Sequence, residues 1–206
     1  MLVWVAALHC EAKPIIDHYR LKKSPSHHNF DVYLKENMLC IISGIGKTAA
    51  AAATAWIAGF NNDETSIAWI NIGTAGSATH TIGTALSIDK ISDDESNRYF
   101  HPVILFDPGL EPAHCRTLSK PSTDYIAQLI YDMEASAFYE TASRFSSAGL
   151  VHCIKIISDN PSQQIGRDKA RISELIKTQI AHLAGFAESL NDMNDQVVQM
   201  EINDPV

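Results

Sequence analysis

Short apolar runs recur along this chain, and each ends in small or polar residues. They span residues 2–8, 38–43, 67–71 and 150–157. Runs of this length and composition are typical of strands buried on both faces, which occur in sheets that helices cover on both sides. Because helical patterns lie between them, the sequence predicts an α/β fold: a three-layer α/β/α sandwich with a central mixed sheet.

Helical patterns are found at residues 11–19, 48–58 and 134–145. Asp168 is a suitable N-cap for a long amphipathic helix whose apolar stripe reaches Leu190. We expect one domain over residues 1–190 and a frayed, acidic tail over residues 191–206. Further strands are expected at residues 31–34, 85–91 and 103–106. Residues 107–122 are expected to be mostly loop, with one strand near residues 114–118.

Composition excludes several classes of function. The net charge of −8 over 206 residues disfavours a nucleic-acid backbone or an anionic membrane surface as partner. No apolar run approaches the roughly 20 residues of a membrane span, and residues 1–8 lack the basic flank of a signal peptide. The four cysteines form no CxxC pair, and no histidine cluster has zinc-ligand spacing, so we expect reduced thiols, a cytoplasmic protein and no metal.

The loop Ser43-Gly44-Ile45-Gly46-Lys47 allows two familiar interpretations. A Walker A loop would need glycine where Ile41 stands. A dinucleotide fingerprint fits Gly44, Gly46 and Ala49, but the strand that follows ends without the carboxylate that would hold the ribose. We therefore expect no NAD or FAD and no other cofactor. A tight strand-to-helix turn explains such glycines equally well.

Three acids lie at strand ends or at the start of a helix: Glu11, Glu134 and Asp159. Each has an ordinary structural explanation, because acids favour helix N-termini and an Asx turn suits Asp159 before Asn-Pro. A loop of small residues, 71–77, follows another strand. Since parallel strands end at one edge of a sheet, these groups are expected to converge on one pocket.

The set of motifs resembles the nucleoside phosphorylase/nucleosidase superfamily, and most closely its methylthioadenosine/S-adenosylhomocysteine nucleosidase branch. The matching pieces follow the order and approximate spacing of the family, over residues 1 to about 190. They are residues 7–11, Ser43-Gly44-Ile45-Gly46-Lys47, Asn71-Ile72-Gly73-Thr74-Ala75-Gly76, Asp132-Met133-Glu134-Ala135 and Ile157-Ser158-Asp159.

This resemblance implies cleavage of the N-glycosidic bond of a purine nucleoside of the adenine type. Asp159 would protonate N7 of the base, Glu134 would bind the ribose hydroxyls, and Glu11 would activate the attacking water. The sugar would pass through an oxocarbenium-like state, as in glycoside hydrolysis. The residues implied to bind the substrate are Met133, Thr74, Ala75, Gly76, Ser158 and Gly44.

Hydrolysis is favoured over phosphorolysis, because no arginine occupies the loops where phosphorylases of this family bind phosphate. The alternatives are a purine nucleoside phosphorylase and a non-catalytic nucleoside-binding homologue. The second rests on the shortness of residues 106–132, where the family supplies an aromatic against the base and this chain offers residues 119–121 and Tyr125. The resemblance also implies a homodimer and a small-molecule nucleoside as ligand.

Overall fold

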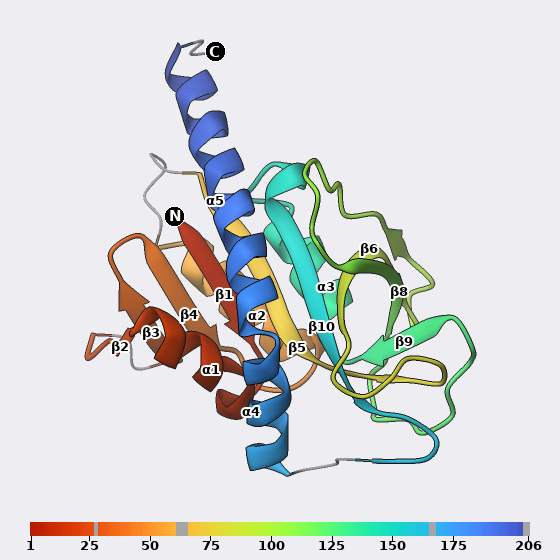
Figure 1. Ribbon diagram of the computed structural model, residues 1–206. Coiled ribbons are helices and arrows are strands. Elements are labelled where there is room, and N and C mark those ends of the chain that lie inside the picture. Colours follow the sequence, from red (N-terminus) through yellow and green to blue (C-terminus); the bar gives the residue numbers. More distant parts are fainter. Residues whose placement is uncertain (27–28, 61–65, 165–167, 204–206) are drawn as a thin grey trace.

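The computed structural model describes residues 1–26, 29–60, 66–164 and 168–203. Figure 1 shows strands in the middle of the molecule and helices around them. The strands are β1 (Leu2–Ala6), β2 (Lys22–Lys23), β3 (Asp31–Lys35), β4 (Met38–Ile42), β5 (Ala68–Ser77), β6 (Ala85–Asp93), β7 (Tyr99–Phe100), β8 (Glu111–Thr117), β9 (Leu129–Asp132) and β10 (Val151–Asp159). The helices are α1 (His9–Tyr19), α2 (Lys47–Ala58), α3 (Ala135–Ala142), the short 3₁₀ turn η1 (Ala148–Leu150), α4 (Lys169–Thr178) and α5 (Ile180–Asn203).

The strands form one mixed sheet in which β1, β4, β5 and β10 run parallel. β10 lies between β5 and β6, and β6, β8 and β9 continue from it until β9 pairs with the end of β5. These five strands therefore close a circuit, whereas β1, β4, β3 and β2 extend from β5 as an open sheet. The predicted mixed sheet is confirmed, and its parallel strands end at one edge.

The helices cover the sheet on two faces, each with its own buried cluster. One cluster joins α1, α4 and α5 to the sheet and includes Trp4, Ile70 and Phe186. The other joins α2 and α3 to the opposite face and includes Trp69 and Phe138. Burial of these aromatic and branched side chains supplies most of the favourable free energy of such a fold. The three-layer α/β/α sandwich expected from the sequence is the observed architecture.

The expected long C-terminal helix is two helices. α4 begins as predicted at Asp168, whose Oδ1 accepts a hydrogen bond from the backbone N–H of Arg171 at 3.0 Å. Gln179 is the C-cap residue at which α4 ends. Its side-chain amide donates a hydrogen bond to the backbone oxygen of Gly83 at 2.8 Å. α5 then continues to Asn203, through most of the segment expected as a frayed tail, and projects beyond the body of the molecule (Figure 1).

Three other sequence expectations need correction. Residues 103–106 form no strand, and none of the described strands pairs with them. Val103 and Leu105 are exposed, Ile104 is half-buried, and Phe106 packs against the rings of His152 and Phe186. β5 does not end at Asn71 but continues through the small-residue loop to Ser77, since β10 and β9 both pair with its far end. β9, which the alternation of helices and strands did not reveal, supplies residues 129–132.

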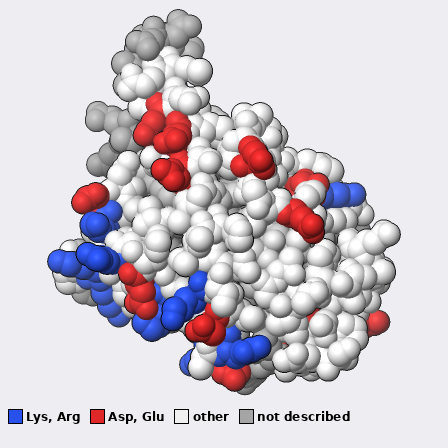
Figure 2. All heavy atoms as spheres, viewed as in Figure 1, with Lys and Arg blue, Asp and Glu red and all other residues white. Residues whose placement is uncertain are grey.

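The described residues contain no helix long and apolar enough to cross a membrane. All four cysteines are buried and unpaired, as expected for reduced thiols. Figure 2 shows lysine and arginine gathered over the side that carries β2, α1 and α4, whereas acidic side chains lie along the projecting part of α5. Charge is thus distributed unevenly over an acidic molecule.

Candidate functional site

A pocket opens at the carboxyl ends of the parallel strands and encloses about 230 Å³. Glu11, Glu134 and Asp159, the three acids singled out from the sequence, all line it. Thr74, Ala75, Gly76, Met133 and Ser158 do so as well, whereas Gly44 does not and its neighbour Ile45 does. These residues come from five chain segments that are far apart in sequence, and they meet in one cavity, as the strand-end pattern predicted.

Glu11 lies in the first turn of α1 and is only 4% exposed. Its Oε1 accepts hydrogen bonds from the backbone N–H and the hydroxyl of Thr74, at 2.9 and 3.0 Å, and its Oε2 accepts one from the backbone N–H of Leu8. Burial raises the pKa of this carboxyl even though the three hydrogen bonds and Lys155 act in the opposite direction. Glu11 is thus a fixed, buried acid whose geometry is set by β5 and by the turn before α1.

Gly73 allows the carboxylate of Glu11 to lie close to the backbone of β5. A Cβ built on it would lie 3.3 Å from Oε1 of Glu11 and 3.6 Å from Nζ of Lys155. A side chain at this position would therefore press on the carboxylate of Glu11 and touch the ammonium group of Lys155 at ordinary contact distance. The glycine is required for close approach, not for a turn, since it lies within β5.

Glu134 stands at the N-terminus of α3 and is 8% exposed. Its Oε1 accepts a hydrogen bond of 2.7 Å from the backbone N–H of Gly46, in the glycine loop that precedes α2. Burial and the neighbouring carboxylate of Asp132 raise the pKa of Glu134 to about 7, although Lys155 and the Gly46 N–H oppose them. The glycine loop therefore serves to position an acid of the pocket, a role different from binding a dinucleotide.

Beneath these acids lies a buried ion pair. Nζ of Lys155, on β10, is 2.7 Å from Oδ2 of Asp132 and also donates to Oδ1 of Asn71 at 2.7 Å. Both charged side chains are at most 1% exposed. Burial opposes both charges, but the attraction between them prevails, so the pKa of Lys155 is raised and that of Asp132 is lowered. The floor of the pocket thus holds a permanent positive charge beside a permanent negative one.

Asp159 ends β10 and is half-buried. Ser158 Oγ donates to Oδ2 of Asp159 at 2.5 Å, and Asp159 pairs across the sheet with Gly76 at a bulge in β10. Of the three acids it is the most open to solvent. A carboxyl group placed this way can meet a ligand directly.

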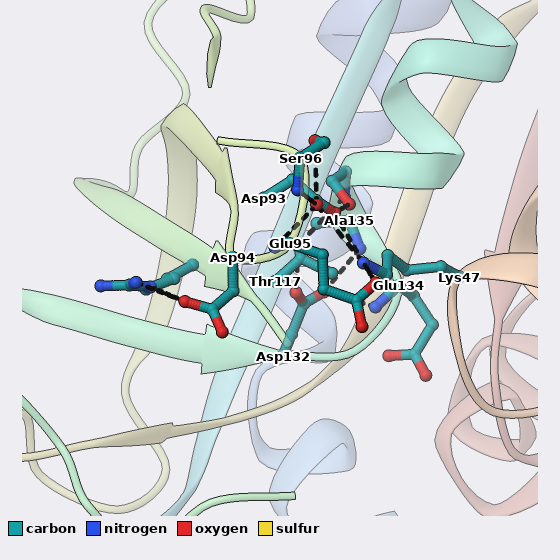
Figure 3. Close-up of polar contacts among 11 residues, drawn as sticks. Lys47, Asp93, Asp94, Glu95, Ser96, Thr117, Asp132, Glu134 and Ala135 are labelled. Carbon is teal, nitrogen blue, oxygen red and sulfur yellow. Dashed lines mark hydrogen bonds and ion pairs between the residues drawn. The ribbon is translucent and has the colours of Figure 1, made fainter. Parts of the chain in front are cut away.

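Polar contacts anchor the start of α3 (Figure 3). Asp132 accepts from the backbone N–H of Ala135 at 2.8 Å and from the hydroxyl of Thr117 at 2.7 Å. On the outer side, Lys47 bridges Asp93 and Glu95, and Asp93 accepts from Ser136 in α3. In this way β6, β8 and α2 hold the helix that presents Glu134.

Sequence reasoning missed the part played by Lys155 and by Asn71. A lysine within the apolar run 150–157 was a usable signal, because an unpaired ammonium group is too costly to bury and so demands a carboxylate partner. In the sequence, Asp132 stood out only as the first residue of the motif Asp132-Met133-Glu134-Ala135. In the part of the chain that the structure describes, no group of three or more His, Cys, Asp or Glu side chains could hold a metal ion.

Known proteins match this chain in structure, but none was found by comparing sequences. No protein-family model and no curated protein matches the chain. Among solved structures, the 5'-methylthioadenosine/S-adenosylhomocysteine nucleosidase of Neisseria meningitidis in complex with methylthio-immucillin-A superposes with a TM-score of 0.72 at 18% identity, covering 89% of this chain and 97% of that one. This chain has the nucleosidase fold.

Two further nucleosidase structures agree with this conclusion. The Arabidopsis thaliana 5'-methylthioadenosine nucleosidase gives a TM-score of 0.69 at 15% identity, covering 94% of this chain and 95% of that one. The futalosine hydrolase of Helicobacter pylori gives 0.70 at 13% identity, covering 91% and 97%. Coverage of both chains is nearly complete, so the likeness extends over the whole fold. At these identities it concerns the fold, and chemistry has to be argued from the site.

Proposed function

We propose that this protein is a nucleosidase that hydrolyses the N-glycosidic bond of a purine nucleoside of the adenine type. One observation carries the proposal: Glu11, Glu134 and Asp159, from α1, α3 and β10, line a single pocket at the carboxyl edge of the parallel strands. If each of these acids had only a structural role, three unrelated causes would have to bring them to the same cavity. The nucleosidase fold supports the same conclusion.

Asp159 is suited to act on the base. A purine anion is a poor leaving group, so a proton delivered to the imidazole ring of the base lowers the barrier, typically about 10²–10⁴-fold for a well-placed acid. Asp159 is the most exposed of the three acids, and Ser158 orients its carboxyl group. Gly76 and Ala75 lie beside it, and neither carries a large side chain that would itself exclude a flat ring.

The other two acids serve the sugar and the water. The carboxyl of Glu134, held by the Gly46 N–H, faces the pocket and can accept hydrogen bonds from ribose hydroxyls. Glu11 uses three of about four lone-pair positions on its carboxylate for Thr74 and Leu8, which leaves capacity for one water molecule. Its raised pKa makes it a better base than an ordinary glutamate.

Water is favoured over phosphate as the nucleophile. Of the described residues that line the pocket, Lys120 is the one with a positive charge, and it comes from the loop after β8. The buried acid Glu11 would repel a phosphate dianion at the sugar end. Lys155 lies close by, but Asp132 already neutralises its charge.

The test is base release from a panel of nucleosides, including 5'-methylthioadenosine, with and without inorganic phosphate. We expect free adenine in phosphate-free buffer and no acceleration when phosphate is added. Strict dependence on phosphate would identify a phosphorylase. Binding without release of base would identify a non-catalytic nucleoside-binding protein. We also propose a homodimer, from the resemblance, and a cytoplasmic location, from the cysteine pattern; light scattering and cell fractionation test them.

A further inference from the structure

Tyr125 occupies one end of the pocket. A Cβ built on Gly76 would lie 2.5 Å from the hydroxyl oxygen of Tyr125 and 2.6 Å from two of its ring carbons. The tip of the tyrosine therefore rests directly on the backbone of Gly76. Because Gly76 pairs with Asp159 across the sheet, the hydroxyl group stands at the end of the pocket where Asp159 lies.

Electrostatics agree with this placement. Burial raises the pKa of Tyr125, and the negative charge of Asp159 raises it further, as expected for a hydroxyl near that carboxylate. The tyrosine thus stands where a base would have to meet its acid. The pocket left beside it, about 230 Å³, falls below the roughly 300–1,000 Å³ typical of sites for small molecules.

The segment that carries Tyr125 is weakly tied to the body. Residues 121–128 form no helix or strand, and all of them except Ser122 and Tyr125 are exposed. Its anchors on β9 are the backbone N–H of Ile126, which donates to the hydroxyl of Tyr131 at 3.0 Å, the backbone oxygen of Ile126, which accepts from the N–H of Leu129 at 3.3 Å, and the packing of the Tyr125 and Tyr131 rings, whose centroids are 5.5 Å apart. A short exposed loop with so few contacts can swing at little cost.

The geometry points to Tyr125 as a specificity-determining plug, which fills the base end of the empty pocket and has to leave Gly76 before a nucleoside can bind. The inference rests on the proposed function. A protein whose binding-competent state is populated for about a tenth of the time binds about tenfold more weakly than the open state would. Tyr125 therefore weakens the binding of every nucleoside and favours those that gain enough from the pocket to displace it.

The experiment compares Tyr125→Phe and Tyr125→Ala with the wild-type protein. Affinity for methylthio-immucillin-A is measured by calorimetry, and KM and kcat by adenine release from 5'-methylthioadenosine. Loss of the hydroxyl or of the whole ring weakens the plug, so we expect both variants to bind the inhibitor up to about tenfold more tightly, with KM falling by a similar factor. Tyr99→Phe, on the exposed strand β7, is the matched control and is expected to change neither constant.

Two results would overturn the inference while leaving the proposed function intact. Affinity unchanged in Tyr125→Phe and weakened in Tyr125→Ala would make the ring an ordinary wall of the binding site. Equal affinity in all three proteins would make Tyr125 irrelevant to the pocket. If neither the wild-type protein nor either variant binds the inhibitor or releases adenine, the proposed function itself fails, and the inference fails with it.

Discussion

Replacing Glu134 by glutamine should make the protein more stable and less active. The carboxyl group is 8% exposed, and its pKa is raised from 4.5 to about 7 by burial and by Asp132. The folded state therefore holds a proton that the unfolded chain gives up near pH 4.5. Stability that is fully present below pH 4.5 is lost as the pH rises to 7, at about 1.4 kcal/mol per pH unit, or about 3 kcal/mol in all.

Glutamine removes this loss, because the amide carries no charge and its oxygen can still accept the hydrogen bond from Gly46. At pH 8 we expect Glu134→Gln to be more stable by about 2–3 kcal/mol, which raises the melting temperature by about 4–12 °C for a chain of this size. At pH 4 the two proteins should melt together. The measurement is thermal unfolding at both pH values, with the exposed Glu111→Gln as control.

Activity should move in the opposite direction. An amide cannot accept hydrogen bonds from ribose hydroxyls as strongly as a carboxylate, so kcat/KM for 5'-methylthioadenosine should fall at least about 10²-fold. In the wild-type protein kcat/KM should rise with pH through about 7, where Glu134 ionises. The reasoning is refuted if the glutamine variant is no more stable than wild type at pH 8, or if its gain is the same at pH 4.

Three further substitutions test the site and its support. Asp159→Asn should lower kcat by about 10²–10⁴-fold while leaving the melting temperature nearly unchanged, and equal activity to the exposed control Asp107→Asn would contradict its role as acid. Lys155→Met should destabilise the fold by about 3–5 kcal/mol in urea unfolding, because it leaves Asp132 charged and buried. Adding Asp132→Asn should recover part of that loss. A double variant as unstable as the single one would argue against charge as the cause. Phe138→Ala should cost about 3–5 kcal/mol by opening a cavity under α3, and a loss below 1 kcal/mol would show that the helix is not held by packing.

The strand ends were predictable because one rule of parallel sheets places them together. Apolar runs predict β1, β4, β5 and β10, and the small or acidic residues at their ends predict the edge of the sheet where the pocket lies. Glu11, Glu134 and Asp159 were found this way, together with the family resemblance. The order of the strands and the closed circuit through β9 were not predicted, since pairing between distant segments leaves no local pattern.

Contacts that depend on tertiary packing were also missed. The Lys155–Asp132 pair joins residues 23 positions apart, and no local period connects them. The position of Tyr125 over Gly76 depends on how an irregular loop folds back, which its sequence of small and polar residues does not specify. The break between α4 and α5 arises from a side chain that reaches to Gly83, almost a hundred residues earlier.

The insertion of β10 between β5 and β6 has a consequence for biosynthesis. A nascent chain that ends before residue 151 already contains α2 and α3, which cover one face of the sheet. It lacks β10, however, which is one of the two strands that link β5 to β6, β8 and β9. It also lacks the last acid and the lysine that neutralises Asp132. A product cut short before residue 151 would therefore lack the Asp159 end of the pocket, and the proposed nucleosidase activity would be absent from it.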